Sequence, residues 1–97
     1  MYGTLARLHP KPDRIDDLMA LGDTMMQGSQ PAGYRVSYLF RPDVNPYDRP
    51  TVFLVAIFDD EATYRANASS PEQDALYRQL RELLEDDPDW SDGTFSG

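Results

Sequence analysis

The segment NASSPEQDALY, residues 67–77, contains two polar side chains whose types could do chemistry. The amide of Asn67 and the phenol hydroxyl of Tyr77 can both form hydrogen bonds with a ligand. The residues between them have a structural explanation, because Ser70 and Gln73 have the spacing of a helix capping box. Asn67 can also simply end a short helix, and Tyr77 can pack in the core with its hydroxyl in water. We therefore take Asn67 and Tyr77 as candidate catalytic residues, with these structural roles as the alternative.

Four further aromatic residues could line a binding pocket around these two. They are Tyr34, Tyr38, Tyr64 and Trp90. Together with Tyr77 they favour a pocket for a flat, mostly apolar small molecule that carries a few polar groups. Ordinary packing in the core is the alternative for each of them taken singly.

Other kinds of site are disfavoured by the composition. The 97 residues include no cysteine, which excludes thiolate chemistry, and a single histidine, His9, which cannot make a multi-histidine metal site within one chain. His9 is itself a candidate base, because histidine titrates near neutral pH. No phosphate-binding loop, dinucleotide fingerprint or haem-attachment motif is present. We expect no metal and no cofactor.

The charge of the chain bears on its partners. Nine Lys and Arg stand against 17 Asp and Glu, for a formal net charge of −8. This acidity argues against nucleic acid and against an anionic membrane surface as partners. The N-terminus shows no basic segment followed by a long apolar one, and no stretch reaches the length of a membrane span, so we expect a cytoplasmic protein.

Hydrophobic periodicity places the candidate residues on an α+β fold. Alternating apolar residues predict strands, and apolar spacings of three and four predict helices. The expected strands span 2–9, 33–41, 51–58 and 89–97, and the expected helices span 13–28, 59–68 and 70–86. Gly28 is the expected end of the first helix. This β-α-β-β-α-β order, with the second helix split in two, is the ferredoxin-like arrangement with an antiparallel sheet, in a single domain of residues 1–97.

The strand at 51–58 is apolar on both faces and needs cover on both. The helices can cover only one face of a small sheet, and the economical cover for the other face is the sheet of an identical chain. This pattern predicts a homodimer that pairs through its sheet faces. We expect Ala6 to face that partner and His9 to lie on the opposite face, and we expect Tyr34 and Tyr38 to share one face of their strand.

The connection between the second and third strands is long. Residues 42–50 hold three prolines in nine positions, which rules out a tight hairpin turn. Such a loop could close over a pocket as a lid, reach a partner chain as an arm or lie in solvent.

Three stretches of the chain resemble the antibiotic biosynthesis monooxygenase family of dimeric α+β barrels. They are ARLHPKPDRIDDL, VFLVAIFDDEATYRANASSPEQDALYRQL and PDWSDG. The most specific part is the pattern Phe58-x-x-Glu61-Ala62-x-Tyr64 followed by Ser70-Pro71-x-x-x-x-x-Tyr77. The resemblance implies a homodimer whose two sheets face each other, with a pocket in each protomer between its sheet and its helices. It also implies that some relatives oxidise phenols, anthrones or quinols with O2 and no cofactor, while others degrade haem.

The resemblance leads to two hypotheses for the function. The first is cofactor-independent monooxygenation of an aromatic, phenolic or quinol small molecule, with Asn67 as a hydrogen-bond donor to the substrate anion beside Tyr77. The second is a non-catalytic dimeric barrel that binds a hydrophobic small molecule or regulates a partner. Haem-degrading relatives use an Asn, a Trp and a His, and the corresponding positions Ala6, Asn67 and Tyr77 all depart from that set, so haem degradation is not expected.

Overall fold

The computed structural model describes residues 1–25 and 30–97. Its elements follow the expected order: β1 (Tyr2–Leu8), α1 (Ile15–Met25), β2 (Tyr34–Phe40), β3 (Val52–Phe58), α2 (Glu61–Ala68), α3 (Pro71–Glu82) and β4 (Asp89–Thr94). The expected end of the first helix at Gly28 lies outside the described residues. The last strand ends at Thr94 and does not continue to the expected residue 97.

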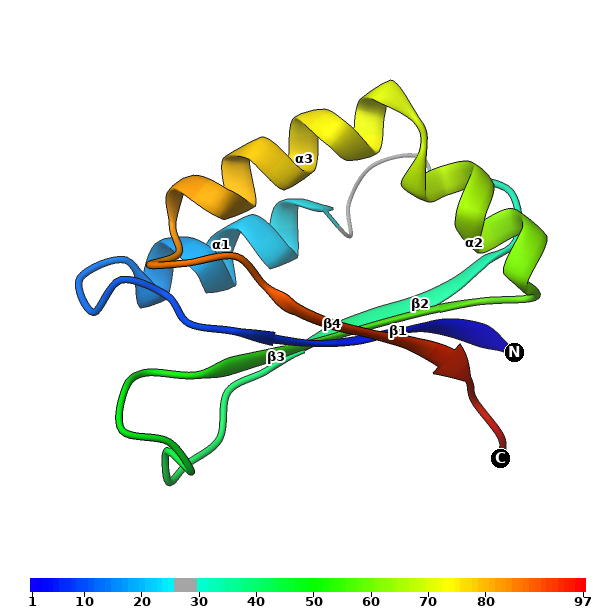
Figure 1. Ribbon diagram of the computed structural model, residues 1–97. Helices are drawn as coiled ribbons and strands as arrows, with labels where there is room; N and C mark the ends of the chain where they lie inside the picture. The colour runs from blue at the N-terminus through cyan, green and yellow to red at the C-terminus, as the bar shows by residue number, and fades with distance from the viewer. Residues whose placement is uncertain (26–29) are drawn as a thin grey trace.

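The strands form one antiparallel sheet in the order β2-β3-β1-β4. The three helices all lie over the same face of this sheet (Figure 1). This is the ferredoxin-like α+β arrangement that the periodicity predicts. Within residues 1–25 and 30–97, no helix is both long and apolar enough to cross a membrane.

The core lies between the sheet and the helices. Ala6 and Leu8 of β1 and Val52 of β3 pack there with Leu18 of α1 and Leu80 of α3. The expectation that Ala6 faces a partner chain is therefore wrong, because its side chain is 0% exposed beneath the helices. Alternation sorts the side chains of a strand into two faces, but it does not show which of two apolar faces the helices cover.

A β-bulge in β2 changes the faces of its aromatic residues. The register shifts between Tyr34 and Val36, so that Tyr34 pairs with Phe58 and Tyr38 pairs with Val55. An extra residue reverses the direction of every side chain beyond it. Tyr34 therefore lies on the helix side, next to buried Phe58, and Tyr38 lies on the other side. The expectation that Tyr34 and Tyr38 share a face is wrong, since strict alternation assumes a strand without a bulge.

The break between α2 and α3 is made by the expected cap, but only half of the capping box forms. The Ser70 hydroxyl accepts a hydrogen bond of 3.1 Å from the backbone N–H of Gln73. The backbone N–H of Ser70 instead donates to the Asn67 carbonyl oxygen at 3.0 Å. The Gln73 side chain is thereby left to accept from the Asn67 amide at 3.4 Å.

The face of the sheet away from the helices, here called the open face, is apolar. Leu5 of β1 and Tyr38 and Phe40 of β2 are 47%, 56% and 58% exposed there, beside Val55 and Ile57 of β3. Contiguous apolar patches on a protein surface often mark sites where another protein or a ligand binds.

The connection 42–50 lies on the same side of the sheet as the open face (Figure 1). The hydroxyl of Tyr47 accepts a hydrogen bond of 3.0 Å from Arg7, whose guanidinium lies 4.8 Å from the centroid of the Tyr47 ring. Arg49 pairs with Asp86 at 2.8 Å, which ties the end of the loop to the chain beyond α3. The loop is thus held at the edge of the open face.

Candidate functional site

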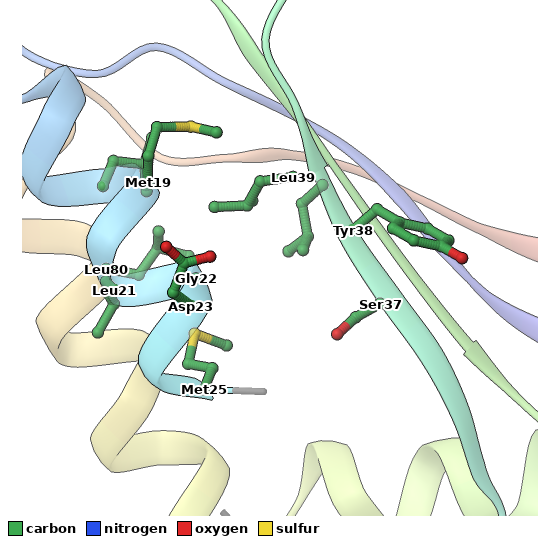
Figure 2. Close-up of a pocket in the computed structure, with 11 residues that line it drawn as sticks. Met19, Leu21, Gly22, Asp23, Met25, Ser37, Tyr38, Leu39 and Leu80 are labelled. Atoms are coloured by element: carbon green, nitrogen blue, oxygen red, sulfur yellow. The ribbon is translucent and has the colours of Figure 1, made fainter. Parts of the chain in front are cut away.

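A cavity of about 160 Å³ lies between α1 and the sheet (Figure 2). Most of its wall consists of leucine and methionine side chains. It is lined by Leu18, Met19, Leu21, Gly22, Asp23 and Met25 of α1, Ser37, Tyr38 and Leu39 of β2, Leu54 of β3 and Leu80 of α3. The cavity therefore lies between helices and sheet, where the resemblance implied a pocket.

The position of α1 over β2 depends on a small residue in the helix. A side chain at Gly22 would collide with the side chain of Leu39, so a glycine there lets α1 approach β2 closely. Leu39 in turn fills the space over Gly22 and forms one wall of the cavity. The methionines beside it, Met19 and Met25, are unbranched and adapt readily to the shape of a ligand.

The cavity wall has few polar groups, and one of them is a hydroxyl that sequence analysis missed. Ser37 of β2 directs its hydroxyl toward the space beside Met25 (Figure 2). That hydroxyl lies 2.7 Å from the hydroxyl of Tyr34, and either group can be the donor. The bulge makes this pair possible, because it brings Tyr34 to the same side of β2 as Ser37. Local alternation carries no signal for such a pairing.

The four residues expected to line the pocket are spread over the fold. Tyr38 borders the cavity, but its ring points away from it toward the open face (Figure 2). Tyr34 and Tyr64 both contact Phe58 edge-to-face, with ring centroids 5.7 Å apart in each pair. Trp90 lies apart from them, on the edge strand β4, and is 45% exposed.

Tyr64 has a structural partner for its hydroxyl. It donates a hydrogen bond of 2.8 Å to Asp92 of β4, and Arg65 donates to the same carboxylate at 3.0 Å. Partial burial, and then the bond to Asp92, raise the pKa of Tyr64 to about 12. Burial opposes the charge on Asp92, but hydrogen bonds from Tyr64, Thr4 and Arg65 outweigh it and lower the pKa of that carboxyl. The Tyr64 phenol therefore keeps its proton at neutral pH, and its hydrogen bond to Asp92 attaches α2 to β4.

The two candidate catalytic residues lie on either side of the α2–α3 corner, with Asn67 near the end of α2 and Tyr77 in the middle of α3. Asn67 is half-buried, and its amide donates to Gln73 at 3.4 Å, which is a long hydrogen bond. Tyr77 is half-buried against Trp90, with ring centroids 6.3 Å apart. The structure thus brings Tyr77 and Trp90 into contact with each other. Among the described residues, the wall of the cavity includes neither Asn67 nor Tyr77.

His9 has a structural position. It is 8% exposed, and its Nδ1 lies 3.3 Å from both the Pro50 carbonyl oxygen and the Thr51 hydroxyl. These contacts join the end of β1 to the beginning of β3. In the part of the chain that the structure describes, no three His, Asp or Glu side chains come together as metal ligands would.

Comparison with known proteins gives no match in sequence and several in structure. No protein-family model and no curated protein sequence matches the chain. A protein from Caulobacter crescentus, provisionally named an antibiotic biosynthesis monooxygenase, superposes with a TM-score of 0.81 at 10% identity over 99% of this chain and 90% of its own. SnoaB from Streptomyces nogalater, named a cofactor-independent oxygenase, superposes with a TM-score of 0.71 at 15% identity over 99% of this chain and 93% of its own.

The chain has the antibiotic biosynthesis monooxygenase fold. Rv0793 from Mycobacterium tuberculosis is also similar, with a TM-score of 0.77 at 22% identity over 99% of this chain and 95% of its own. Identities this low establish the monooxygenase fold alone, because one fold supports many activities. The activity has to be argued from the site.

Proposed function

We propose that the protein is a cofactor-independent monooxygenase that uses O2 to oxidise an aromatic, phenolic or quinol small molecule. The observation that carries this proposal is the apolar cavity between α1 and the sheet, in a chain with the monooxygenase fold. The name of SnoaB, a cofactor-independent oxygenase with the same fold, adds support. Catalysis of this kind asks for an apolar space, hydrogen bonds to a substrate anion and the exclusion of water.

The reaction needs no reductant. A phenol first loses its proton, and the resulting anion gives an electron to O2. One oxygen atom then forms a new carbonyl group on the ring, and the other leaves as water with the two hydrogens that the substrate has lost. For phenol itself, phenol and O2 become benzoquinone and water, so that atoms and electrons balance. In this proposal the Asn67 amide stabilises the substrate anion and Tyr77 acts beside it.

Asn67 must give up a hydrogen bond within the chain before it can bind a substrate. Its amide donates to Gln73 at 3.4 Å, and breaking this long bond to form a stronger one to an anion costs little free energy. The amide lies outside the wall of the 160 Å³ cavity, so that a substrate must extend toward the α2–α3 corner to reach it. Tyr77 and Trp90 would then flank the ring system from the side of β4.

We also propose that the protein works as a homodimer in which two open faces pack together. Leu5, Tyr38 and Phe40 are about half exposed on that face and would be buried by a second copy. A chain of 97 residues buries a limited share of its own apolar surface, so it gains much from such a partner. The loop at 42–50 lies at the edge of the same face and would contact the partner as an arm.

A second function is supported by a different observation. The Asn67 amide is paired with Gln73, and Tyr77 packs on Trp90, so both candidate catalytic groups already have partners within the chain. This favours a non-catalytic dimeric barrel that binds a hydrophobic small molecule in the cavity or regulates a partner.

One experiment separates the two functions. The protein is incubated with a panel of hydroquinones and anthrones, and O2 uptake above the uncatalysed rate is recorded. Uptake that depends on the protein supports the monooxygenase. A thermal shift with the same compounds, without O2 uptake, supports the binding protein. A haem titration followed at the Soret band tests the remaining possibility of a haem-binding relative, and the cytoplasmic location stays a prediction.

A further inference from the structure

Four aromatic rings form a continuous row that runs from β2 to the beginning of β1. Tyr34 and Tyr64 each contact Phe58, with ring centroids 5.7 Å apart in both pairs. Tyr64 also contacts Tyr2, at 5.5 Å between centroids. In the part of the chain that the structure describes, the other ring contacts are separate pairs. Because neighbouring rings of the row pack edge to face, an electron can tunnel from one tyrosine to the next without crossing water.

One end of the row reaches the cavity. Ser37 directs its hydroxyl toward the cavity and lies 2.7 Å from the hydroxyl of Tyr34 (Figure 2). With Tyr34 as the donor, its proton can pass to Ser37 while the Ser37 proton passes to a group in the cavity. Phe58, which is 2% exposed, fills the space between Tyr34 and Tyr64. It has no hydroxyl, so it transmits an electron between the two tyrosines without holding a radical itself.

The middle of the row has a proton acceptor. A phenol that loses an electron becomes a strong acid, so a tyrosine that is oxidised reversibly needs a base within hydrogen-bond reach. The Tyr64 hydroxyl donates to Asp92 at 2.8 Å, and Arg65 holds the same carboxylate at 3.0 Å. Although burial opposes it, these hydrogen bonds lower the pKa of Asp92 and make it a weak base. It can still take this proton, because a phenol radical cation is a far stronger acid than a carboxylic acid.

The other end of the row lies at the protein surface. Tyr2 is half-buried, and its hydroxyl accepts a hydrogen bond of 2.9 Å from Arg65, which is exposed. The Arg65 guanidinium also lies 5.6 Å from the centroid of the Tyr2 ring. Because Tyr2 is the acceptor in this bond, its own proton can leave for solvent. A reductant in solution can approach the ring here.

We propose that Tyr34, Tyr64 and Tyr2 form a path along which an oxidising equivalent leaves the cavity for the protein surface. The oxidant is a one-electron acceptor in the cavity, of the class of peroxyl and phenoxyl radicals. The path goes beyond the proposed monooxygenase and does not rest on it, because any such radical in the cavity would feed it.

Each step balances in electrons and protons. The radical takes an electron from Tyr34 and a proton from Ser37, which receives the Tyr34 proton. Tyr64 then reduces Tyr34 and passes its own proton to Asp92, while Tyr34 recovers a proton from solvent through Ser37. Tyr2 reduces Tyr64 in turn, Tyr64 takes its proton back from Asp92, and the Tyr2 proton goes to solvent. The sum is one hydrogen atom moved from Tyr2 to the radical. A thiol in solution returns a hydrogen atom to Tyr2 and becomes a thiyl radical.

The test places a photo-oxidant at the cavity end of the path in the full-length protein, without any substrate. The chain has no cysteine, so Asp23→Cys, at an exposed position on the cavity wall, takes a ruthenium tris-bipyridine label at one site. Light and a soluble electron acceptor convert the label into a strong one-electron oxidant. A nitroso spin trap marks the tyrosine that carries the radical, and peptide mass spectrometry identifies it. We expect the adduct at Tyr2.

Variants of the labelled protein test each member of the path. Tyr34→Phe and Tyr64→Phe should each lose most of the Tyr2 adduct. Tyr38→Phe is the matched control and should keep it, because Tyr38 also borders the cavity but its ring points to the open face. Asp92→Asn can still accept the Tyr64 hydrogen bond but cannot take the proton, so the Tyr2 radical should form more slowly in freeze-quench EPR. Circular dichroism establishes that each variant is folded.

A second label position tests the direction of the path. The same label on Val44→Cys, an 82% exposed position in the 42–50 loop, should give no Tyr2 adduct that depends on Tyr34. Equal Tyr2 adducts with and without the Tyr34 hydroxyl, or an adduct at Tyr38 in place of Tyr2, would overturn the path. O2 uptake with hydroquinones and anthrones is measured separately. A Tyr2 adduct without uptake supports the path and contradicts the monooxygenase, whereas uptake without a Tyr2 adduct contradicts the path alone.

Discussion

The Tyr64 hydroxyl donates a hydrogen bond of 2.8 Å to the Asp92 carboxylate and thereby joins α2 to the edge strand β4. Arg65, the next residue of the helix, donates to the same carboxylate at 3.0 Å and to the hydroxyl of Tyr2 at 2.9 Å. A tyrosine that looks like a pocket residue in the sequence thus attaches a helix to the sheet. The contact also makes the stability of the fold sensitive to alkaline pH.

Stability should fall as the pH rises from about 10 to about 12. The pKa of Tyr64 is raised from 10.0 to about 12 in the folded chain, so the unfolded chain loses this proton first. The contribution of Tyr64 is complete below pH 10 and is lost as the pH rises through its folded pKa. Urea unfolding at pH 8, 10 and 11 measures the loss, and Tyr64→Phe should reduce its pH dependence. Tyr47→Phe, which removes a hydroxyl paired with Arg7, is the control and should keep the wild-type pH profile.

Gly33→Ala should destabilise the protein by about 2 kcal/mol or more. Gly33 has a φ of 78°, and a Cβ there would lie 2.5 Å from the Cβ of Thr63 at the start of α2. Both strain and collision therefore oppose the substitution. Gly93→Ala is the matched control, because a Cβ at Gly93 meets nothing within 4 Å. The free energies of unfolding in urea compare the two variants, and equal losses would contradict the role assigned to the Gly33 conformation.

Ile57→Asp should dissociate the proposed homodimer while the monomer stays folded. Ile57 lies on the open face opposite Gly3, so a charge there would be buried only by a partner chain. Its dimer Kd should rise about 100-fold or more, measured by light scattering over a dilution series. Ala66→Asp, on the exposed surface of α2, should leave the Kd unchanged. A dimer that survives Ile57→Asp would show that the open face is not the interface.

Leu80→Asp should instead unfold the chain. Leu80 of α3 is 6% exposed in the core, where a carboxylate would be buried within a single chain. Circular dichroism should show loss of helix for Leu80→Asp and native helix for Ile57→Asp. Loss of helix in Ile57→Asp would mean that the open face is part of the core of a single chain.

Asn67→Ala should lower the turnover of the best substrate about 100-fold or more if its amide stabilises the substrate anion. Tyr77→Phe, which keeps the contact with Trp90 and removes only the hydroxyl, should lower turnover if that hydroxyl takes part. Ser69→Ala is a nearby control that alters a helix-end hydroxyl alone. Turnover is followed by O2 uptake, with thermal unfolding to establish that each variant is folded. Unchanged turnover in both variants would remove Asn67 and Tyr77 from the site.

Features that depend on neighbouring residues were predictable from the sequence. The cap at Ser70 follows from residues three apart, and the structure contains its hydrogen bond to Gln73. The order of strands and helices follows from periodicity in the same way. The two-sided apolar pattern of residues 51–58 correctly indicated that helices would leave one face of the sheet uncovered.

Features that depend on contacts between distant residues were not predictable. Nothing in the alternation of β1 distinguishes the core side of Ala6 from the exposed side of Leu5. The hydroxyl pair of Tyr34 and Ser37 exists only because of the bulge between them, which is set by pairing with β3. The bond from Tyr64 to Asp92 spans 28 residues of sequence and has no local signature.

The bulge in β2 also affects how this chain should be aligned with other proteins. A relative whose second strand lacks the extra residue needs a gap of one position between Tyr34 and Val36. Without that gap, residues on one side of the bulge are matched to positions on the wrong face of the sheet, and functional roles are transferred to side chains that point away from the cavity. At sequence identities between 10% and 22%, identical residues are too few to reveal this misalignment. The hydrogen-bond register therefore has to place the gap before any residue is compared.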